Sequence, residues 1–293
     1  MSNVIILMPV LNEAENIYKT VLSIQSQTYS DWTLIIHDNS STDGTYEIAR
    51  EIAGSDFRIC VYKSQLTHEI QDNWKQIASI ALNDFESSYL IWMGGDDLWS
   101  CNTFLEKKVD FLVENSDYSC VSSAVAILDS DSESAIRICS RSNSSIVRVL
   151  HYLFDYEQIN VLWSLMPRET FTRLTSHPSF KLGGFRGFDW YFGLGLFYFG
   201  KVGFDPESEY LKRIRLNPQV SEKSIGRVSF AAAYLSFMQP YIENFWSQRG
   251  RLRRLPWHIL AIVIMSQLLL SHLRLIRFFC LRSIQILSIR GRK

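Results

Sequence analysis

The stretch WTLIIHDNSSTDGTYEIAREIA, Trp32–Ala53, decides the fold, because it places a strand, a turn and a helix in one short run. Trp32–His37 is predominantly apolar and predicts a strand. The residues DNSSTDG that follow are small and polar, and they predict a turn. Thr45–Ala53 is predicted to form a helix. A strand that passes through a turn into a helix is the first half of a β-α-β unit.

The same alternation continues on both sides of this stretch. Further strands are predicted at Val4–Met8, Phe57–Tyr62 and Tyr89–Met93, and further helices at residues 13–27, Trp74–Leu82 and Thr103–Glu114. Strands and helices that alternate in this way imply a parallel sheet with helices on both of its faces. The sequence therefore predicts an α/β fold built on a mostly parallel central sheet.

Polar clusters follow three of the predicted strands. They are Pro9–Glu13, Asp38–Asp43 and Gly94–Asp97. Ligands of open parallel sheets bind outside the carboxyl ends of the strands. We therefore expect the three clusters to line one crevice.

Asp96 and Asp97 stand side by side at the end of an apolar run, LIWMGGDDLW, Leu90–Trp99. Two adjacent carboxylates repel each other, and in a crevice a divalent cation is the natural partner that offsets this repulsion. Mg²⁺ and Mn²⁺ prefer carboxylate oxygens and share their coordination with substrate phosphates. The alternative is a solvated turn before a helix, where aspartate is common.

Asp38 ends the strand of the opening stretch. A carboxylate at this place can accept hydrogen bonds from the imide of a nucleobase or from a ribose hydroxyl. The alternative is a local Asx turn, because the sequence NSSTDG has turn chemistry in any protein.

Charge is distributed unevenly along the 293 residues. Lys plus Arg equals Asp plus Glu, 30 against 30, but residues 249–293 contain ten basic residues and no acidic one. The rest of the chain then has 20 basic and 30 acidic residues. An acidic body with a basic tail suggests that the tail has a partner of its own. We expect no nucleic-acid partner.

Several enzyme classes lack their signatures here. The chain has no G-x-x-x-x-G-K-[ST] loop, no G-x-S-x-G elbow and no G-x-G-x-x-G after the first strand. The five cysteines are scattered without a C-x-x-C pair, which favours a reduced cytosolic compartment without structural zinc. These absences argue against P-loop nucleotide hydrolysis, α/β-hydrolase chemistry and dinucleotide oxidoreduction.

Three motifs resemble the nucleotide-sugar-binding half of family 2 glycosyltransferases, which have the GT-A fold. They are ILMPVLNE (Ile6–Glu13), HDNSSTDGT (His37–Thr45) and WMGGDDLW (Trp92–Trp99), in the order of that family. The resemblance is strong over about Val4–Val125 and extends more weakly to about Ser221. We expect a nucleotide-sugar-binding subdomain at residues 1–125, an acceptor-binding subdomain at 126–225 and a helical tail at 226–293.

The resemblance assigns roles to residues at the strand ends. Asp38 corresponds to the aspartate that binds the base, and Pro9, Leu11, Asn12 and Glu13 line the pocket for the base and ribose. Asp97 corresponds to a metal ligand and Asp96 to a contact with ribose or the metal shell, the ion being Mn²⁺ or Mg²⁺. The family pattern usually has another aspartate where this chain has Gly94.

Two further residues are candidates outside the strand ends. Lys75, in the predicted helix, could approach the diphosphate or could be an ordinary solvated lysine. Asp189 lies in GGFRGFDWYFGLGLFYFGKV, Gly183–Val202, which resembles the family segment that carries the catalytic base. The alternative role for Asp189 is to cap the apolar helix that follows.

The resemblance implies an inverting, metal-dependent transfer of a sugar, with a UDP-sugar as the expected donor, to an acceptor hydroxyl. A glycan or lipid-linked glycan is the expected acceptor, as in the assembly of bacterial-type surface polysaccharides or glycolipids. One competing hypothesis is a non-catalytic nucleotide-sugar-binding or scaffold protein on the same fold. Another is a nucleotidyltransferase, which would need a glycine- and basic-rich phosphate loop after the first strand, and Pro9–Glu13 is not such a loop.

The tail combines apolar residues with basic ones. Pro256–Leu273 is apolar over about 18 residues, and residues 267–288 place a basic stripe opposite a broad apolar face. Such a helix is typical of a membrane interface. We therefore expect a cytoplasmic protein held peripherally on the inner face of the cell membrane by residues 249–293. Helices packed on a protein surface, or one spanning helix, are the alternatives.

Overall fold

A computed structural model of the chain describes residues 3–128, 143–145, 147–148, 161–176 and 188–213. The chain divides into two compact units, Met1–Asn217 and Pro218–Lys293. The second unit lies outside the described residues, and so does the predicted tail. The predicted boundary at residue 125 stays a prediction.

A five-stranded sheet forms the centre of the first unit, in the order β3-β2-β1-β4-β7. Its strands are β1 (Val4–Val10), β2 (Trp32–Asp38), β3 (Ile59–Lys63), β4 (Tyr89–Trp92) and β7 (Met166–Pro167). The first four run parallel, whereas β7 is antiparallel to β4. Every residue of β1 from Val4 to Met8 is fully buried, which explains why this strand is apolar without alternation.

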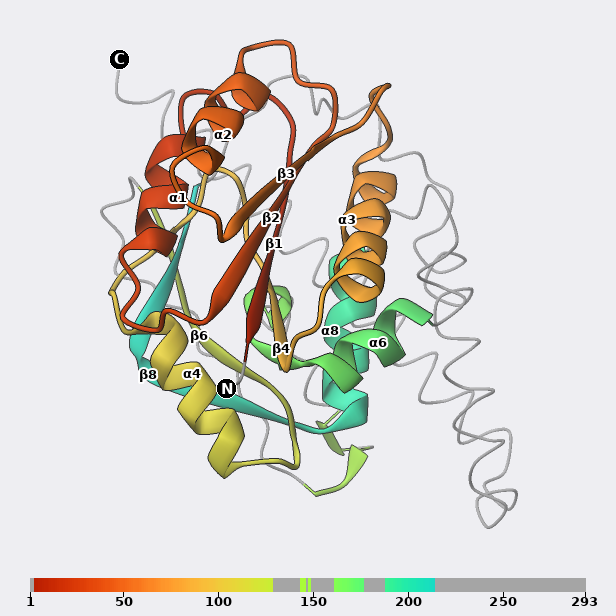
Figure 1. Cartoon of the computed structure of the whole chain (residues 1–293). Coiled ribbons are helices and arrows are strands. Elements are labelled where there is room, and N and C mark those ends of the chain that lie inside the picture. Colours follow the sequence, from red (N-terminus) through yellow and green to blue (C-terminus); the bar gives the residue numbers. More distant parts are fainter. Residues whose placement is uncertain (1–2, 129–142, 146, 149–160, 177–187, 214–293) are drawn as a thin grey trace, which may run out of the picture. The chain divides into compact units, whose positions relative to one another are not determined.

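Helices cover both faces of this sheet, as Figure 1 shows. Two helices, α1 (Ile17–Gln25) and α2 (Thr45–Ala53), lie on one face, and α3 (Ile70–Asp84) lies on the other against β1 and β2. Gly44, directly before α2, has a φ of 96°, a left-handed conformation that glycine adopts without strain. The turn predicted from the sequence DNSSTDG therefore leads directly into α2.

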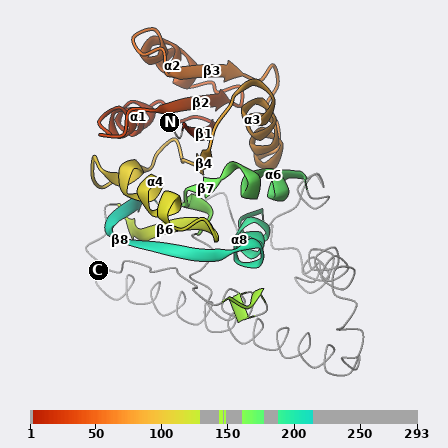
Figure 2. The same ribbon diagram turned by 60° about the horizontal axis from the view of Figure 1, so that its bottom comes forward.

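A second sheet has the order β5-β8-β6. It consists of β5 (Leu98–Trp99), β8 (Lys201–Lys212) and β6 (Tyr118–Ile127), and α4 (Phe104–Glu114) packs along β6 and β8 (Figure 2). Strand β5 directly follows the Gly94–Asp97 cluster, and it pairs with the C-terminal end of β8. The C-terminal end of β8 is thus brought next to the loop that follows β4 of the first sheet, although the two are more than 100 residues apart in the chain.

Two further helices carry aromatic side chains to the end of β4. They are α6 (Arg168–Ser176) and α8 (Phe188–Phe199). Phe171 of α6 and Phe192 of α8 both contact the Trp92 ring, with centroids 5.5 and 6.0 Å away. These contacts place the N-terminal half of α8 next to the last residue of β4.

The parallel sheet and its helices were predicted correctly, with α2 at the expected residues. The first helix is shorter than predicted, beginning at Ile17 rather than residue 13. Residues 14–16 form a turn instead, beside which the amides of Glu13 and Ala14 donate hydrogen bonds to Thr45 at the start of α2 and to Asp43. The antiparallel direction of β7 and the pairing of β6 with β8 were not predicted.

No helix within the described ranges is both long and apolar enough to cross a membrane.

Candidate functional site

The three polar clusters meet at the carboxyl edge of the central sheet. Val10, the last residue of β1, pairs with Asp38, the last residue of β2. Gly95 packs so closely on β1 that an added Cβ would lie 2.7 Å from Cγ1 of Val10 and 2.9 Å from Cγ of Glu13. A side chain at position 95 would therefore clash where the loop after β4 crosses the end of β1, and the loops after β1, β2 and β4 lie together at one edge of the sheet.

Hydrogen bonds join the loop after β1 to the loop after β2. The Asn12 amide donates to Oγ of Ser41 at 2.9 Å, and Oδ1 of Asn12 accepts from the Thr42 amide at 3.0 Å. Glu13 donates through its amide to Oγ1 of Thr45 at 2.7 Å. Asn12 has a φ of 56°, a left-handed conformation that asparagine tolerates better than most residues. The predicted pocket residues 9–13 are thus held rigidly beside Asp38.

Asp43 completes this junction. Its carboxylate accepts from the amides of Ala14 and Thr45, both at 3.0 Å. Partial burial would raise the pKa of Asp43, but the hydrogen bonds from Thr45 and Ala14 outweigh it, and the pKa lies below its usual value. Asp43 is therefore a structural carboxylate, as the turn sequence suggested.

Asp38 is fully buried, and its two carboxylate oxygens have different environments. Oδ2 accepts from the Ser41 amide at 3.0 Å, which is the Asx-type bond expected of a turn. Oδ1 is also buried, but it has no hydrogen-bond partner among the described residues. A buried acceptor without a donor is costly. The turn alternative therefore accounts for only one of the two oxygens.

Two residues next to Asp38 support the same corner, and their roles were not predicted. The Asn39 side chain exchanges two hydrogen bonds with the His68 backbone, at 2.8 and 2.9 Å. Nδ1 of His37 bonds to Oδ1 of Asn73, which lies on α3. Burial lowers the pKa of His37, so its ring is neutral at physiological pH. These bonds fix the segment after β3 against the end of β2.

Asp97 is only 2 % exposed and is held from strand β8. Its Oδ2 accepts from the Tyr210 hydroxyl at 2.7 Å, and its Oδ1 accepts from the Arg213 amide at 2.9 Å. Burial raises the pKa of Asp97 to about 6, although the hydrogen bonds from Tyr210 and Arg213 favour the carboxylate form. Asp97 is thus an ionisable group kept in a dry, organised position.

Asp96 and Asp97 direct their carboxyl groups to the same space above Gly94. A Cβ added to Gly94 would lie 2.9 Å from Cγ of Asp97 and 3.3 Å from Oδ1 of Asp96. The two carboxylates are therefore close neighbours rather than groups on opposite sides of a turn. Electrostatic repulsion between two neighbouring carboxylates is relieved when a cation lies between them.

The residues fit a hard divalent cation that shares its coordination with a phosphate ligand. Groups of three or more His, Cys, Asp or Glu side chains suited to a metal are absent from the described part of the chain. Mg²⁺ is commonly held by one or two carboxylates together with substrate phosphates and water. Asp96 and Asp97 supply that number of carboxylates.

Two basic side chains near the carboxyl edge of the central sheet have different contacts. Nζ of Lys75, on α3, forms an ion pair with Asp72 at 2.9 Å. Nζ of Lys212, at the end of β8, lies 5.4 Å from the ring centroid of Trp163, and its charge favours the ionised form of Asp97. Lys212 is therefore a basic group whose charge reaches the carboxylate cluster without a direct contact among the described residues.

Asp189 lies in the first turn of α8, one residue after the helix begins. Its side chain falls outside the described part of the structure. One turn further along the helix, Phe192 packs on Trp92, two residues before Gly94. The backbone thus brings the start of α8 towards the end of β4, and the predicted role of Asp189 stays a prediction.

Comparison with known proteins identifies the family of this chain. The family model described as glycosyl transferase family 2 matches residues 5–180, more than half of the chain. The chain belongs to glycosyl transferase family 2. The resemblance found in the three strand-end motifs is thereby confirmed.

Curated relatives match this family 2 member over part of its length. The putative glycosyltransferase EpsE of Bacillus subtilis is 32% identical over 126 residues, 42% of this chain and 43% of the relative. An Escherichia coli protein, UDP-Glc:alpha-D-GlcNAc-diphosphoundecaprenol beta-1,3-glucosyltransferase WfgD, is 26% identical over 38% of this chain and 41% of its own. The chain therefore matches less than half the length of these relatives.

Solved structures support the fold of the family 2 chain. S. aureus TarS 1–349 in complex with UDP-GlcNAc superposes with a TM-score of 0.62 at 12% identity, covering 82% of this chain and 66% of that chain. At this identity the likeness shows the fold alone. The expected α/β architecture resembling GT-A glycosyltransferases is thus confirmed for the body of the chain.

Proposed function

We propose that this chain is an inverting, metal-dependent glycosyltransferase that moves a sugar from a nucleoside-diphosphate donor to an acceptor hydroxyl. The observation that carries the proposal is the meeting of two features at one sheet edge. One is the buried Oδ1 of Asp38, which has no partner among the residues that the structure describes, and the other is the carboxylate pair of Asp96 and Asp97. The first suits a nucleobase, and the second suits a cation-bound diphosphate.

The donor would lie across the ends of β1 and β2. Asp38 would accept a hydrogen bond from the imide of the base through Oδ1, which makes a uracil base suitable. Pro9, Leu11, Asn12 and Glu13 would line the base and ribose, supported by the bonds of Asn12 and Glu13 to the loop after β2. A UDP-sugar is further suggested by TarS, which was solved with UDP-GlcNAc, and by WfgD, whose name includes UDP-Glc.

Asp96 and Asp97 would hold Mn²⁺ or Mg²⁺. Each oxygen of Asp97 already accepts one hydrogen bond, but a carboxylate oxygen has a second lone pair for a ligand. The bound cation would neutralise the charge that develops on the departing diphosphate. Lys75 and Lys212 would contribute further positive charge, although Lys75 would first have to leave Asp72.

Asp189 would act as the general base. Its carboxylate would take the proton of the acceptor hydroxyl while that oxygen forms a bond to the anomeric carbon and the bond to the diphosphate breaks. Attack from the face opposite the leaving group inverts the anomeric centre. A positioned base of this kind contributes about 10²–10⁴ in rate.

The acceptor would be a glycan or a lipid-linked glycan. The names of two relatives point to this class, since WfgD refers to a diphosphoundecaprenol and TuaG of Bacillus subtilis to teichuronic acid biosynthesis. The basic, apolar residues 249–293 would hold the protein peripherally on the cytoplasmic face of the membrane, where such an acceptor is anchored.

The proposal is tested by a thermal-shift screen of nucleotide-sugars with and without Mn²⁺, followed by assay of donor hydrolysis. We expect UDP-sugars to raise Tm more with Mn²⁺ than without it, and the best donor to be hydrolysed slowly without an acceptor. Failure of every nucleotide-sugar to stabilise the protein would refute donor binding. Stabilisation without any hydrolysis or transfer would instead indicate a non-catalytic binding protein.

A further inference from the structure

Tyr210 links the second sheet to the proposed cation site. It is fully buried on β8, and its hydroxyl makes two hydrogen bonds at once. It donates to Oδ2 of Asp97 at 2.7 Å and accepts from the amide of Gly94 at 3.0 Å. One hydroxyl therefore fixes both the side chain and the backbone of the Gly94–Asp97 cluster.

The Tyr210 ring is itself held in place. The ring of Trp163 stacks on it with centroids 5.1 Å apart and an interplanar angle of 15°. Trp74 of α3 contacts Trp163 in turn, at 6.0 Å between centroids. This packing leaves the hydroxyl little freedom to follow Asp97 if that carboxylate moves.

The register of β8 is fixed immediately before Tyr210. Pro206, Glu207 and Ser208 form a bulge, since Asp205 pairs with Ser123 of β6 and Glu209 with the next residue, Ala124. Glu209 bonds to Ser100 in both directions, at 2.9 and 3.1 Å. The position of Tyr210 along β8 is therefore set independently of Asp97.

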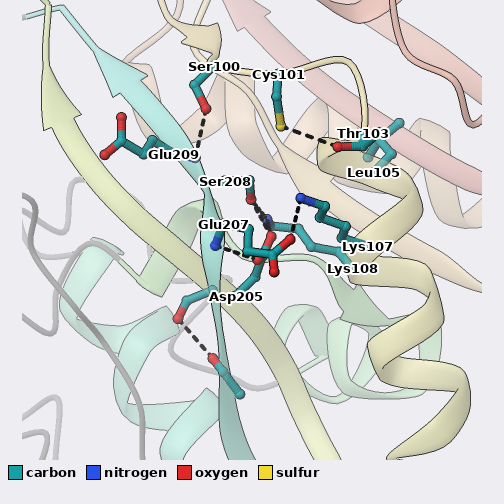
Figure 3. A network of polar contacts seen from close by, with 12 residues as sticks. Ser100, Cys101, Thr103, Leu105, Lys107, Lys108, Asp205, Glu207, Ser208 and Glu209 are labelled. Carbon is teal, nitrogen blue, oxygen red and sulfur yellow. Dashed lines mark hydrogen bonds and ion pairs between the residues drawn. The ribbon is translucent and has the colours of Figure 1, made fainter.

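A buried ion pair supports the bulge from the side of α4 (Figure 3). Lys108, which is fully buried, reaches from α4 to Oδ2 of Asp205 at 3.2 Å and to Oγ of Ser208 at 2.8 Å. Lys107 forms a second ion pair with Glu207 at 2.7 Å. Burial lowers the pKa of Lys108 to about 8, but the group is still charged at neutral pH.

Gly94 makes the arrangement possible. A Cβ at this position would lie 2.9 Å from Cγ of Asp97 and closer still to Oδ2, the atom that Tyr210 holds. Any side chain at position 94 would therefore push the Asp97 carboxylate away from the Tyr210 hydroxyl.

We propose that Tyr210 is a positioning residue for Asp97, and that it functions as a pair with Gly94. The absent side chain at position 94 provides the space into which the tyrosine draws the Asp97 carboxylate. This inference rests on the proposed function, because it concerns the affinity of the same cluster for a divalent cation. It also implies that Gly94→Asp, which would restore an acid to the motif, weakens the site.

The first test is Tyr210→Phe, which keeps the stacked ring and removes the hydroxyl. The matched control is Tyr118→Phe on β6, a partly buried tyrosine that packs on Phe111 away from the cluster. Free Mn²⁺ would be measured by electron paramagnetic resonance with UDP present, and UDP binding without metal by calorimetry. We expect Tyr210→Phe to lower Mn²⁺ affinity about tenfold, as is typical for residues that orient metal ligands, and to change metal-free UDP binding less than twofold.

The second test uses Gly94→Ala and Gly94→Asp. We expect each to lower Mn²⁺ affinity at least as much as Tyr210→Phe, and the double variant Gly94→Ala/Tyr210→Phe to lose less than the sum, because both changes release the same carboxylate. Wild-type Mn²⁺ affinity in Tyr210→Phe, or tighter binding in Gly94→Asp, would overturn the inference. If Tyr210→Phe does not fold, the comparison of the two Gly94 variants decides it.

The outcomes separate this inference from the proposed function. If the wild-type protein binds no Mn²⁺ in the presence of UDP, the proposed metal site fails. If the wild type binds and Tyr210→Phe binds equally well, only the role of Tyr210 fails.

Discussion

At the scale of single residues, Asp38 offers the sharpest test of the donor site. In Asp38→Asn the amide oxygen can still accept from Ser41, but the NH₂ group takes the place of the unpartnered Oδ1. A donor would then face the donor of a base imide, so we expect UDP affinity to fall at least tenfold, about 1.4 kcal/mol or more. Stability should change little, because one buried polar group without a partner among the described residues replaces another. Calorimetry with UDP measures the effect, with Asp84→Asn, at the exposed end of α3, as control.

A second residue-scale prediction concerns Asp189. We expect Asp189→Asn to reduce transfer by about 10²–10⁴, because the amide cannot take a proton from the acceptor hydroxyl. Binding of UDP with Mn²⁺ should stay within about twofold of the wild type, since the base does not contact the nucleotide in this proposal. Turnover with the best donor and calorimetry with UDP give the two values. Wild-type turnover in this variant would assign the proton transfer to another group.

At the scale of elements, the turn between α2 and β3 is held by a charged cluster. Asp56 accepts three hydrogen bonds from Arg58, whose guanidinium also lies 3.8 Å from the ring centroid of Trp32. These bonds to Arg58 lower the pKa of Asp56 to about 2 against the opposing effect of burial. Because the folded-state pKa is below the unfolded value, this stabilisation is present above about pH 4 and is lost as the pH falls through 2.

We therefore expect Asp56→Asn to lower the free energy of unfolding by about 1–2 kcal/mol at pH 7, allowing for partial solvent screening. The difference from the wild type should shrink as the pH approaches 2.5. Urea unfolding of both proteins at several pH values measures it. A difference that does not depend on pH would show that packing, rather than the ionised carboxylate, accounts for the loss.

The second element-scale prediction concerns the bulge in β8. Lys108→Met leaves Asp205 as a buried carboxylate without its cation, so we expect a loss of about 3–5 kcal/mol in the free energy of unfolding. Asp205→Asn should lower the free energy of unfolding less in the Lys108→Met protein than in the wild type, because in the Lys108→Met protein it removes an unpaired charge. Urea unfolding of the four proteins in a double-mutant cycle tests this. Equal costs in both backgrounds would mean that the two side chains do not interact.

Some helices, strands and site residues could be predicted from the sequence, and others could not. The motifs after β1, β2 and β4 could be placed at one edge because parallel strands bring their carboxyl ends together, and each motif lies next to its own strand. Tyr210 could not be found in this way, because it lies 113 residues from Asp97 and occupies an ordinary strand position. The spacing of apolar residues indicates local secondary structure only. It does not indicate which distant strands pair, so the pairing of β6 with β8 could not be predicted.

At the scale of the whole molecule, the charge asymmetry predicts that the basic tail, rather than the acidic body, binds the membrane. We expect the full chain to sediment with liposomes containing anionic lipid, and a chain ending at Gln248 to stay in the supernatant. The basis is the ten basic residues of the tail, each worth about 1 kcal/mol near an anionic surface. Raising the salt concentration should release the full chain in part. Equal sedimentation of both chains would reject the tail as the anchor.

The bond between Gly94 and Tyr210 has a practical consequence for finding similar enzymes. A search pattern that demands an acid at the first position of the Gly94–Asp97 cluster would discard this chain, although its two remaining carboxylates stay together. The residues that compensate are 116 positions apart, so a short linear pattern cannot register them. Searches for sugar-transferring enzymes should therefore score such distant pairs of residues together. A glycine at this position can indicate a cation site with a different arrangement of residues rather than an inactive site.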